Sequence, residues 1–200
     1  MNPDKKKYLL VIAGPTASGK TETAIKLAKA FGTEIVSADS RQIYKEMTIG
    51  TAVPSADELA AAKHHFVHHI SVHQSYDVAT YENEVLQLLE GLFKKYDLVI
   101  LSGGTGLYLD AVCRGLDNIP ETSPEIRARV DKLFRDKGLP ALQKEVKKND
   151  PDYYAKVDIN NPRRLQRALE VIWQTGQPFS FYRKRQAIPR YFETIWTAIE

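Results

Sequence analysis

Gly14-Pro15-Thr16-Ala17-Ser18-Gly19-Lys20-Thr21 is the stretch that decides how this 200-residue chain folds. It matches the pattern G-x-x-x-x-G-K-[ST], in which glycines let backbone N–H groups turn toward phosphate oxygens. The apolar run Tyr8–Ala13 before it predicts a strand buried on both faces, and the apolar residues of Lys20–Phe31 after it have helical spacing. This strand–loop–helix context predicts a loop that binds a di- or triphosphate group.

Strands and helices continue to alternate beyond this loop. Residues 34–38 predict a second strand that ends at Asp39, and residues 81–93 predict an amphipathic helix. Residues 98–101 predict a third buried strand, which ends in Ser102-Gly103-Gly104. Because the polar and glycine residues follow the strand ends, the pattern predicts an α/β fold, a doubly wound parallel sheet like that of the P-loop NTPases.

The pattern changes after Pro120. Ser123 and Pro124 predict the start of a helix, as its cap and first-turn residue. Helical spacing continues to about residue 175, with breaks near residues 138–140 and 149–151, and residues 193–199 again predict a strand. We therefore expect a P-loop core at 1–120, a helical insertion at 121–189, and a return strand at 190–200.

Charge is divided unevenly between the two parts. Residues 1–120 hold 12 Lys and Arg against 14 Asp and Glu, whereas residues 121–200 hold 16 against 11, within a net charge of +3. The basic second part indicates an anionic polymer as partner, although a solvated helical surface gives the same composition. The single Cys113 excludes an internal disulfide and fits a reducing cytosol. With neither a signal peptide nor a membrane span in the pattern, we expect a cytoplasmic monomer without a membrane partner.

The acidic residues argue against phosphoryl transfer. Nucleotide hydrolases and kinases usually carry an Asp at the end of a later buried strand, where it helps to hold magnesium. The strand at 98–101 ends without an acid, and Asp39 is the acid best placed beside the loop. Its neighbours Arg41, Gln42 and Tyr44 favour a catalytic role for Asp39. The structural alternative is a helix cap that Asp39 makes with Ser40.

All five histidines lie between His64 and His73. The pairs His64/His68 and His65/His69 have the i,i+4 spacing that could chelate zinc on a helix. The apolar residues among them favour a short apolar segment with polar edges instead.

A second basic cluster belongs to a predicted helix. Arg163, Arg164 and Arg167 lie one turn apart and can share a face. Apolar residues form the opposite face: Leu165, Ala168, Leu169 and Ile172. The basic face can contact RNA or can simply be solvated.

Five ordered motifs resemble those of the tRNA dimethylallyltransferases, also called tRNA isopentenyltransferases. They are the loop at 14–21, Asp39-Ser40-Arg41-Gln42-Ile43-Tyr44, Ile49-Gly50-Thr51-Ala52, Gly103-Gly104-Thr105-Gly106-Leu107-Tyr108, and the run from Asn161 to Val171. Members of this family transfer a dimethylallyl group from its diphosphate to N6 of the adenosine just 3′ of the anticodon in certain tRNAs. The chain departs from the family pattern at Val53, where many members have Lys, and at His68, where Asp is common. It also resembles a C-terminally truncated member, since the family usually has further helices.

The resemblance implies a role for each matching residue. Asp39 is the general base on the adenine amine, and Lys20 and Thr21 hold the diphosphate, which Gly14–Thr21 surrounds. Thr21 also reaches a bound Mg²⁺. The implied partners are dimethylallyl diphosphate and the anticodon stem-loop of a tRNA. The implied tRNA contacts are Asp39, Ser40, Arg41, Gln42, Thr105, Arg127, Arg163, Arg164, Leu165, Gln166 and Arg167.

Two other functions use the same features. A small-molecule or nucleoside kinase would use the loop to bind ATP, would turn ATP over, and would not need the basic helices. An RNA-binding module with a relict loop would bind tRNA equally well without Lys20.

Overall fold

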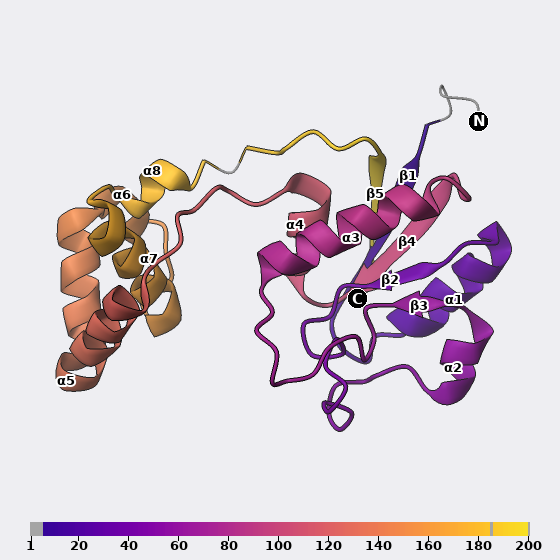
Figure 1. Ribbon diagram of the computed structural model, residues 1–200, viewed down its shortest axis with the longest axis horizontal. Helices are drawn as coiled ribbons and strands as arrows, with labels where there is room; N and C mark the ends of the chain where they lie inside the picture. Colours follow the sequence, from indigo (N-terminus) through magenta and orange to yellow (C-terminus); the bar gives the residue numbers. More distant parts are fainter. Residues whose placement is uncertain (1–5, 185, 200) are drawn as a thin grey trace. The chain divides into compact units, whose positions relative to one another are not determined.

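The structure is a computed structural model that describes residues 6–184 and 186–199. These residues form two compact units, one up to Leu116 together with the part from Ala187 onward, and the other Asp117–Gln186 (Figure 1). The elements of the first unit are β1 (Tyr8–Ala13), α1 (Lys20–Phe31), β2 (Ile35–Ser37), α2 (Ala56–Ala61), β3 (His64–His65), α3 (Val78–Leu92), β4 (Leu98–Gly103), α4 (Gly106–Arg114) and β5 (Glu193–Ala198). The second unit contains α5 (Pro124–Asn149), α6 (Pro151–Tyr154), α7 (Pro162–Thr175) and α8 (Phe179–Tyr182).

The first unit is built on a five-stranded sheet in the order β3-β2-β4-β1-β5. Every pair of neighbouring strands is parallel, and β1 lies between β4 and β5, with Leu9 opposite both Val99 and Thr194. This arrangement confirms the predicted α/β class with a parallel sheet. In such a sheet all strands end at the same edge, so the loops that follow β1, β2 and β4 meet there.

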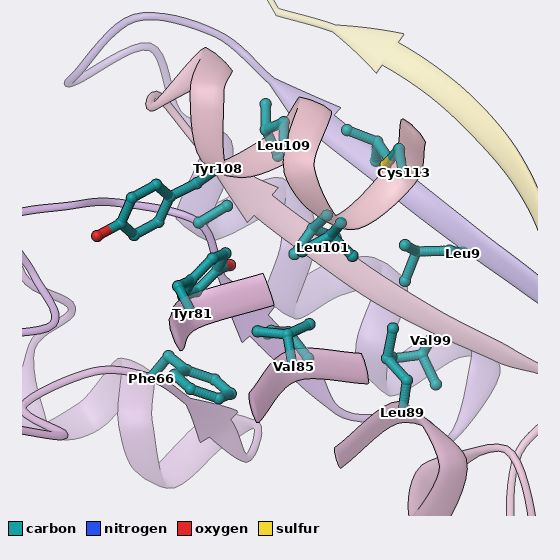
Figure 2. Packing of buried hydrophobic residues seen from close by; sticks show 14 of the residues in the cluster. Leu9, Phe66, Tyr81, Val85, Leu89, Val99, Leu101, Tyr108, Leu109 and Cys113 are labelled. Atoms are coloured by element: carbon teal, nitrogen blue, oxygen red, sulfur yellow. The ribbon is translucent and has the colours of Figure 1, made fainter. Parts of the chain in front are cut away.

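The side chains of each strand point alternately to the two faces of the sheet, and this divides the core into two layers. Leu9 and Val11 of β1 pack with α3 and α4, whereas Leu10 and Ile12 pack with α1. Figure 2 shows the first of these layers, with Leu101 lying against α4. Successive side chains of a strand point to opposite faces, so a strand covered by helices on both sides must be apolar throughout. This requirement explains the unbroken apolar run from which β1 was predicted.

The second unit has a helical core of its own. Ser123 caps α5 by accepting a hydrogen bond from the backbone N–H of Ile126, and Pro124 occupies the first turn, as predicted. Gly138, with a φ of 68°, interrupts the helical backbone at the first expected break. Asp150 caps α6 at the second break. The apolar faces of these helices enclose a separate core: Val130, Leu142, Val146, Tyr153, Leu165, Ala168, Leu169, Val171, Ile172 and Phe179.

The unit boundaries differ from the expected divisions after residues 120 and 189. Ile119 packs against the helical core, and Pro120 accepts a hydrogen bond from Arg167, so this segment belongs to the second unit. On the return, Ile188 donates its backbone N–H to Arg114 and packs against Gly115, so it already belongs to the first unit. The composition changes at Pro120, but these contacts move the boundary to the end of α4. β5 (Glu193–Ala198) lies within the segment 190–200 that was expected to return as a strand, and Glu200 lies outside the described residues.

Arg190 fastens the returning chain to the first unit. Its Nε donates to the carbonyl of Val112 at 2.9 Å, and its Nη2 donates to the carbonyl of Ala111 at 2.7 Å. The same guanidinium pairs with Glu82 of α3, and both side chains of this pair are nearly buried. These bonds satisfy carbonyl groups at the C-terminal end of α4 and direct the chain into β5. The sequence pattern gave no indication of this ion pair.

Gly103, the last residue of β4, lies closer to β2 than any other residue type would allow. A Cβ at this position would overlap the carbonyl group of Ala38 and lie 2.8 Å from its Cα. Gly91, near the end of α3, has open space around its Cα.

We expect Gly103→Ala to lower the free energy of unfolding by about 3 kcal/mol, at the upper end for an overpacked site, because backbone must move. The control Gly91→Ala should be neutral or stabilising by up to about 1 kcal/mol, since it lies in a helix with room for a methyl group. Chemical denaturation of both variants measures this difference. Equal midpoints for the two variants would contradict the close packing of β2 and β4.

Candidate functional site

The phosphate loop joins β1 to α1 at the edge where the strands end. Ala17 and Gly19 have left-handed backbone, with φ values of 65° and 85°. Gly14 lies so close to the end of the chain that a Cβ would be 2.6 Å from the carbonyl oxygen of Ile199. The Ser18 hydroxyl is buried and has no hydrogen-bond partner among the described residues. A turned backbone at a helix N-terminus with an unused buried hydroxyl suits an anion that accepts hydrogen bonds.

Lys20 supplies the positive charge of the loop. Its ammonium group donates to the carbonyl of Pro15, inside the loop. Burial lowers the pKa of Lys20, and the nearby negative charge of Asp39 opposes that shift. The lysine of the loop and the acid after β2 therefore lie within electrostatic reach of each other, as the sequence predicted.

Asp39 is held by the turn that follows β2. Its Oδ1 accepts hydrogen bonds from the backbone N–H groups of Arg41 at 2.9 Å and Gln42 at 3.2 Å. Residues 40–43 form a turn and no helix begins there, so the alternative of a helix cap is wrong. Only one carboxylate oxygen has these bonds, which leaves Oδ2 able to accept a proton.

Thr105 connects this turn to β4. The backbone N–H of Ser40 donates to Thr105 Oγ1 at 2.9 Å, and the Thr105 hydroxyl lies 3.2 Å from Ser40 Oγ. The backbone N–H of Thr105 also donates to the carbonyl of Ala38. Gly104 comes close to the loop, since a Cβ there would lie 3.2 Å from the carbonyl oxygen of Gly14. The structure thus brings together the ends of three strands that are far apart in the sequence.

Gln42 has a structural task that the motif did not reveal. Its Oε1 accepts a hydrogen bond from the Ser37 hydroxyl, and its Nε2 donates to the carbonyls of Thr51 at 3.2 Å and Ala52 at 2.8 Å. The side-chain amide therefore holds the turn at Ile49–Ala52 against β2, and its polar atoms are occupied within the chain. Because this motif and the Asp39 motif are separate in sequence, only the fold shows that Gln42 joins them.

The basic helix α7 divides its arginines between two roles. Arg163 and Arg164 are exposed. Arg167 donates to the Thr122 hydroxyl at 3.1 Å and to the carbonyl of Pro120, and it also pairs with Glu170. Arg167 thus anchors the entry of the helical unit, whereas Arg163 and Arg164 remain available to a partner.

Three other predicted RNA contacts in this unit are engaged internally. Arg127 Nε donates to the same Thr122 hydroxyl at 3.0 Å. Gln166 Nε2 donates to Asp131 at 2.9 Å. The Leu165 side chain is fully buried in the helical core, because it lies on the apolar face of α7. Any contact of Leu165 with RNA would have to come from its backbone.

The histidines do not form the i,i+4 pairs of a helix. His64 and His65 lie in the edge strand β3, where neighbouring side chains point to opposite faces. His65 Nε2 lies 2.6 Å from Glu34, and His69 Nε2 lies 3.1 Å from Glu84. Among residues 6–184 and 186–199 there is no group of three or more His, Cys, Asp or Glu that could hold a metal ion.

Within the same described ranges, the helices are all too short or too polar to cross a membrane.

Comparison with known proteins gives a consistent set of relatives. The model of the IPP transferase family matches residues 42–200. A tRNA dimethylallyltransferase of Christiangramia forsetii is 48% identical over 188 residues, which are 94% of this chain and 62% of that protein. One of Flavobacterium johnsoniae is 46% identical over 200 residues, covering 97% of this chain and 65% of that protein. The chain therefore spans less than two thirds of the length of these relatives.

Solved structures give the same answer for the fold. The match to a eukaryotic dimethylallyltransferase, described as acting on tRNA, covers 96% of this chain and 48% of that chain, with a TM-score of 0.77 and 27% identity. The match to the full-length tRNA isopentenylpyrophosphate transferase of Bacillus halodurans covers 87% of this chain and 58% of that chain, with a TM-score of 0.55 and 36% identity.

Proposed function

The chain belongs to the IPP transferase family, and from this premise we propose that it transfers a dimethylallyl group from dimethylallyl diphosphate to N6 of the adenosine just 3′ of the anticodon in tRNA. The observation that carries the proposal is the position of Asp39. Its turn is bonded to Thr105 beside the phosphate loop, and its carboxylate is within electrostatic reach of Lys20. One edge of the sheet thus offers an anion cradle and a proton acceptor together.

The anion cradle and the proton acceptor would assist different parts of the reaction. N6 of adenine attacks C1 of the allylic donor, the bond between C1 and the diphosphate oxygen breaks, and the N6 proton passes to Asp39. An exocyclic amine is a weak nucleophile, so a positioned carboxylate assists as the proton leaves. The departing diphosphate gains negative charge, which the loop N–H groups and Lys20 stabilise. Nothing attacks phosphorus, which agrees with the missing acid at the end of β4.

Mg²⁺ fits this site as a cofactor. Magnesium takes most of its ligands from phosphates and water and needs few protein groups, so a carboxylate cluster is not required. Thr21, in the first turn of α1, would hold the ion with its hydroxyl. When bound, the ion would neutralise charge on the leaving diphosphate.

The helical unit supplies the charge for RNA. Arg163 and Arg164 are exposed at the start of α7, and residues 121–200 carry the excess of positive charge. An adenine stacked inside the anticodon loop cannot reach a base and a donor in a protein pocket, so it must be turned out of the stack. Phosphate contacts from basic helices hold the remainder of the loop while that happens.

Titration calorimetry with dimethylallyl diphosphate and with ATP tests the choice of donor. We expect the protein to bind the allylic diphosphate and to leave ATP unhydrolysed, since β4 ends without the acid of a phosphoryl-transfer enzyme. Binding and turnover of ATP far above those of dimethylallyl diphosphate would favour a kinase and contradict the proposal.

Asp39→Asn tests the proton acceptor. Asn keeps an oxygen that can accept from Arg41 and Gln42, so the turn should be preserved while the base is lost. We expect single-turnover transfer to fall by about 10²–10⁴-fold, the usual contribution of a general base, with little change in tRNA affinity. A variant that transfers at the wild-type rate would exclude Asp39 as the base.

The salt dependence of tRNA affinity distinguishes the exposed arginines of α7 from Arg167, which is bonded within the helical unit. Changing Arg163 and Arg164 together to Ala should weaken tRNA binding and reduce the slope of log affinity against log salt by up to about one unit per lost phosphate contact. The matched control is Arg167→Ala, which removes bonds within the unit and should lower thermal stability instead. If the double variant keeps the wild-type slope and affinity, these arginines are a solvated face and tRNA is held elsewhere.

A further inference from the structure

Tyr108 is a nearly buried tyrosine in α4 whose hydroxyl has no task in the fold. Its side chain is only 7% exposed. Its ring stacks on that of Tyr81, with centroids 4.1 Å apart and planes inclined by 24°. Figure 2 shows the Tyr108 hydroxyl pointing away from the packed residues around it. Among the residues that the structure describes, no group forms a hydrogen bond with this oxygen, and it is not one of their buried polar atoms without a partner, so the hydroxyl is open to a ligand from solvent.

The position of the Tyr108 ring is tied to the turn that holds Asp39. Tyr81 is fully buried and donates its hydroxyl to the carbonyl of Ser37 at 2.9 Å. Ser37 ends β2, two residues before Asp39. Thr105, the N-cap residue of α4, is bonded to Ser40 of the same turn. Two independent sets of contacts therefore fix Tyr108 relative to Asp39.

The charged and polar groups near Tyr108 limit what its hydroxyl can bind. Burial, together with nearby Tyr44, Asp77 and Asp39, raises the pKa of Tyr108 to about 12. The phenol therefore stays protonated at neutral pH and can donate a hydrogen bond. Two of its neighbours are carboxylates, which would repel a second anion, so the hydroxyl is poorly placed for the diphosphate. A neutral ligand with an acceptor beside a donor fits this position.

Adenine has that pattern on the edge that reacts. N6 carries the donor hydrogens, and the ring nitrogens N1 and N7 on either side of it are acceptors. We propose that the Tyr108 hydroxyl donates to one of these two ring nitrogens and so turns N6 toward Asp39. This inference rests on the proposed function and adds a specificity-determining residue to it. No proton is transferred by Tyr108, which acts only by orienting the base.

Tyr108→Phe tests the inference, because it keeps the stacked ring and removes only the hydroxyl. With anticodon stem-loop RNA and dimethylallyl diphosphate, we expect the saturating rate of transfer to fall about tenfold, as for loss of one hydrogen bond. Donor affinity and the thermal midpoint should not change, since the hydroxyl has no bond within the described residues. The control is Tyr96→Phe, whose hydroxyl binds Glu34 ahead of β2, at the opposite edge of the sheet. It should transfer at the wild-type rate.

Modified acceptors identify the atom that Tyr108 contacts. Stem-loops with 1-deazaadenosine or 7-deazaadenosine at the reactive position each lack one ring nitrogen. The saturating transfer rate of the wild type should be about tenfold lower with one of these analogues than with normal RNA. With that same analogue, Tyr108→Phe should transfer at the same rate as the wild type. The inference is overturned, and the proposed function stands, if Tyr108→Phe transfers to normal RNA at the wild-type rate. The same holds if the variant is slower than the wild type by one factor on normal RNA and on both analogues. A wild-type protein that transfers to none of them would contradict both.

Discussion

The site depends on the close approach of the β4 backbone to the β2 backbone at Gly103. No side chain fits between Gly103 and Ala38, so the two strands can end side by side. The next residues extend this contact, because Gly104 lies against Gly14 of the phosphate loop and Thr105 bonds to Ser40. Glycine at these positions lets three chain segments approach closely at one edge of a parallel sheet. The anion cradle, the acid and the aromatic pair beside it all take their positions from this junction.

The junction brings a basic and an acidic group within electrostatic reach of each other, and the proposed reaction gives them separate tasks. In the proposed reaction Lys20 and the loop N–H groups would stabilise the departing diphosphate, whereas Asp39 uses one carboxylate oxygen for its turn and keeps the other available to accept a proton. Tyr108 stacks on Tyr81, whose own hydroxyl is bonded to the carbonyl of Ser37. In the proposed reaction, the basic loop would hold the donor, and Asp39 and Tyr108 would take the neutral base. The helical unit adds exposed arginines without taking part in this chemistry.

Much of this could be predicted from sequence because the signals are local. The loop pattern, the apolar run of β1, the cap at Ser123 and the break at Gly138 each reflect the needs of neighbouring residues, and each agrees with the structure. The remaining features depend on contacts between distant segments. Gln42 was read as an RNA contact, but its amide spans from Ser37 to Ala52. Leu165 belonged to a basic motif, yet helical geometry turns its side chain into the core. The clamp of Arg190 on α4 and Glu82 joins residues about eighty or more positions apart, and spacing cannot reveal it.

The most direct test of the account is transfer itself. The purified protein would be incubated with Mg²⁺, isotopically labelled dimethylallyl diphosphate and unmodified tRNA, and the RNA would then be digested to nucleosides for mass spectrometry. The account predicts label on N6 of the single adenosine just 3′ of the anticodon, with release of one diphosphate for each group transferred. Label on no nucleoside, or consumption of ATP in place of the allylic donor, would contradict it.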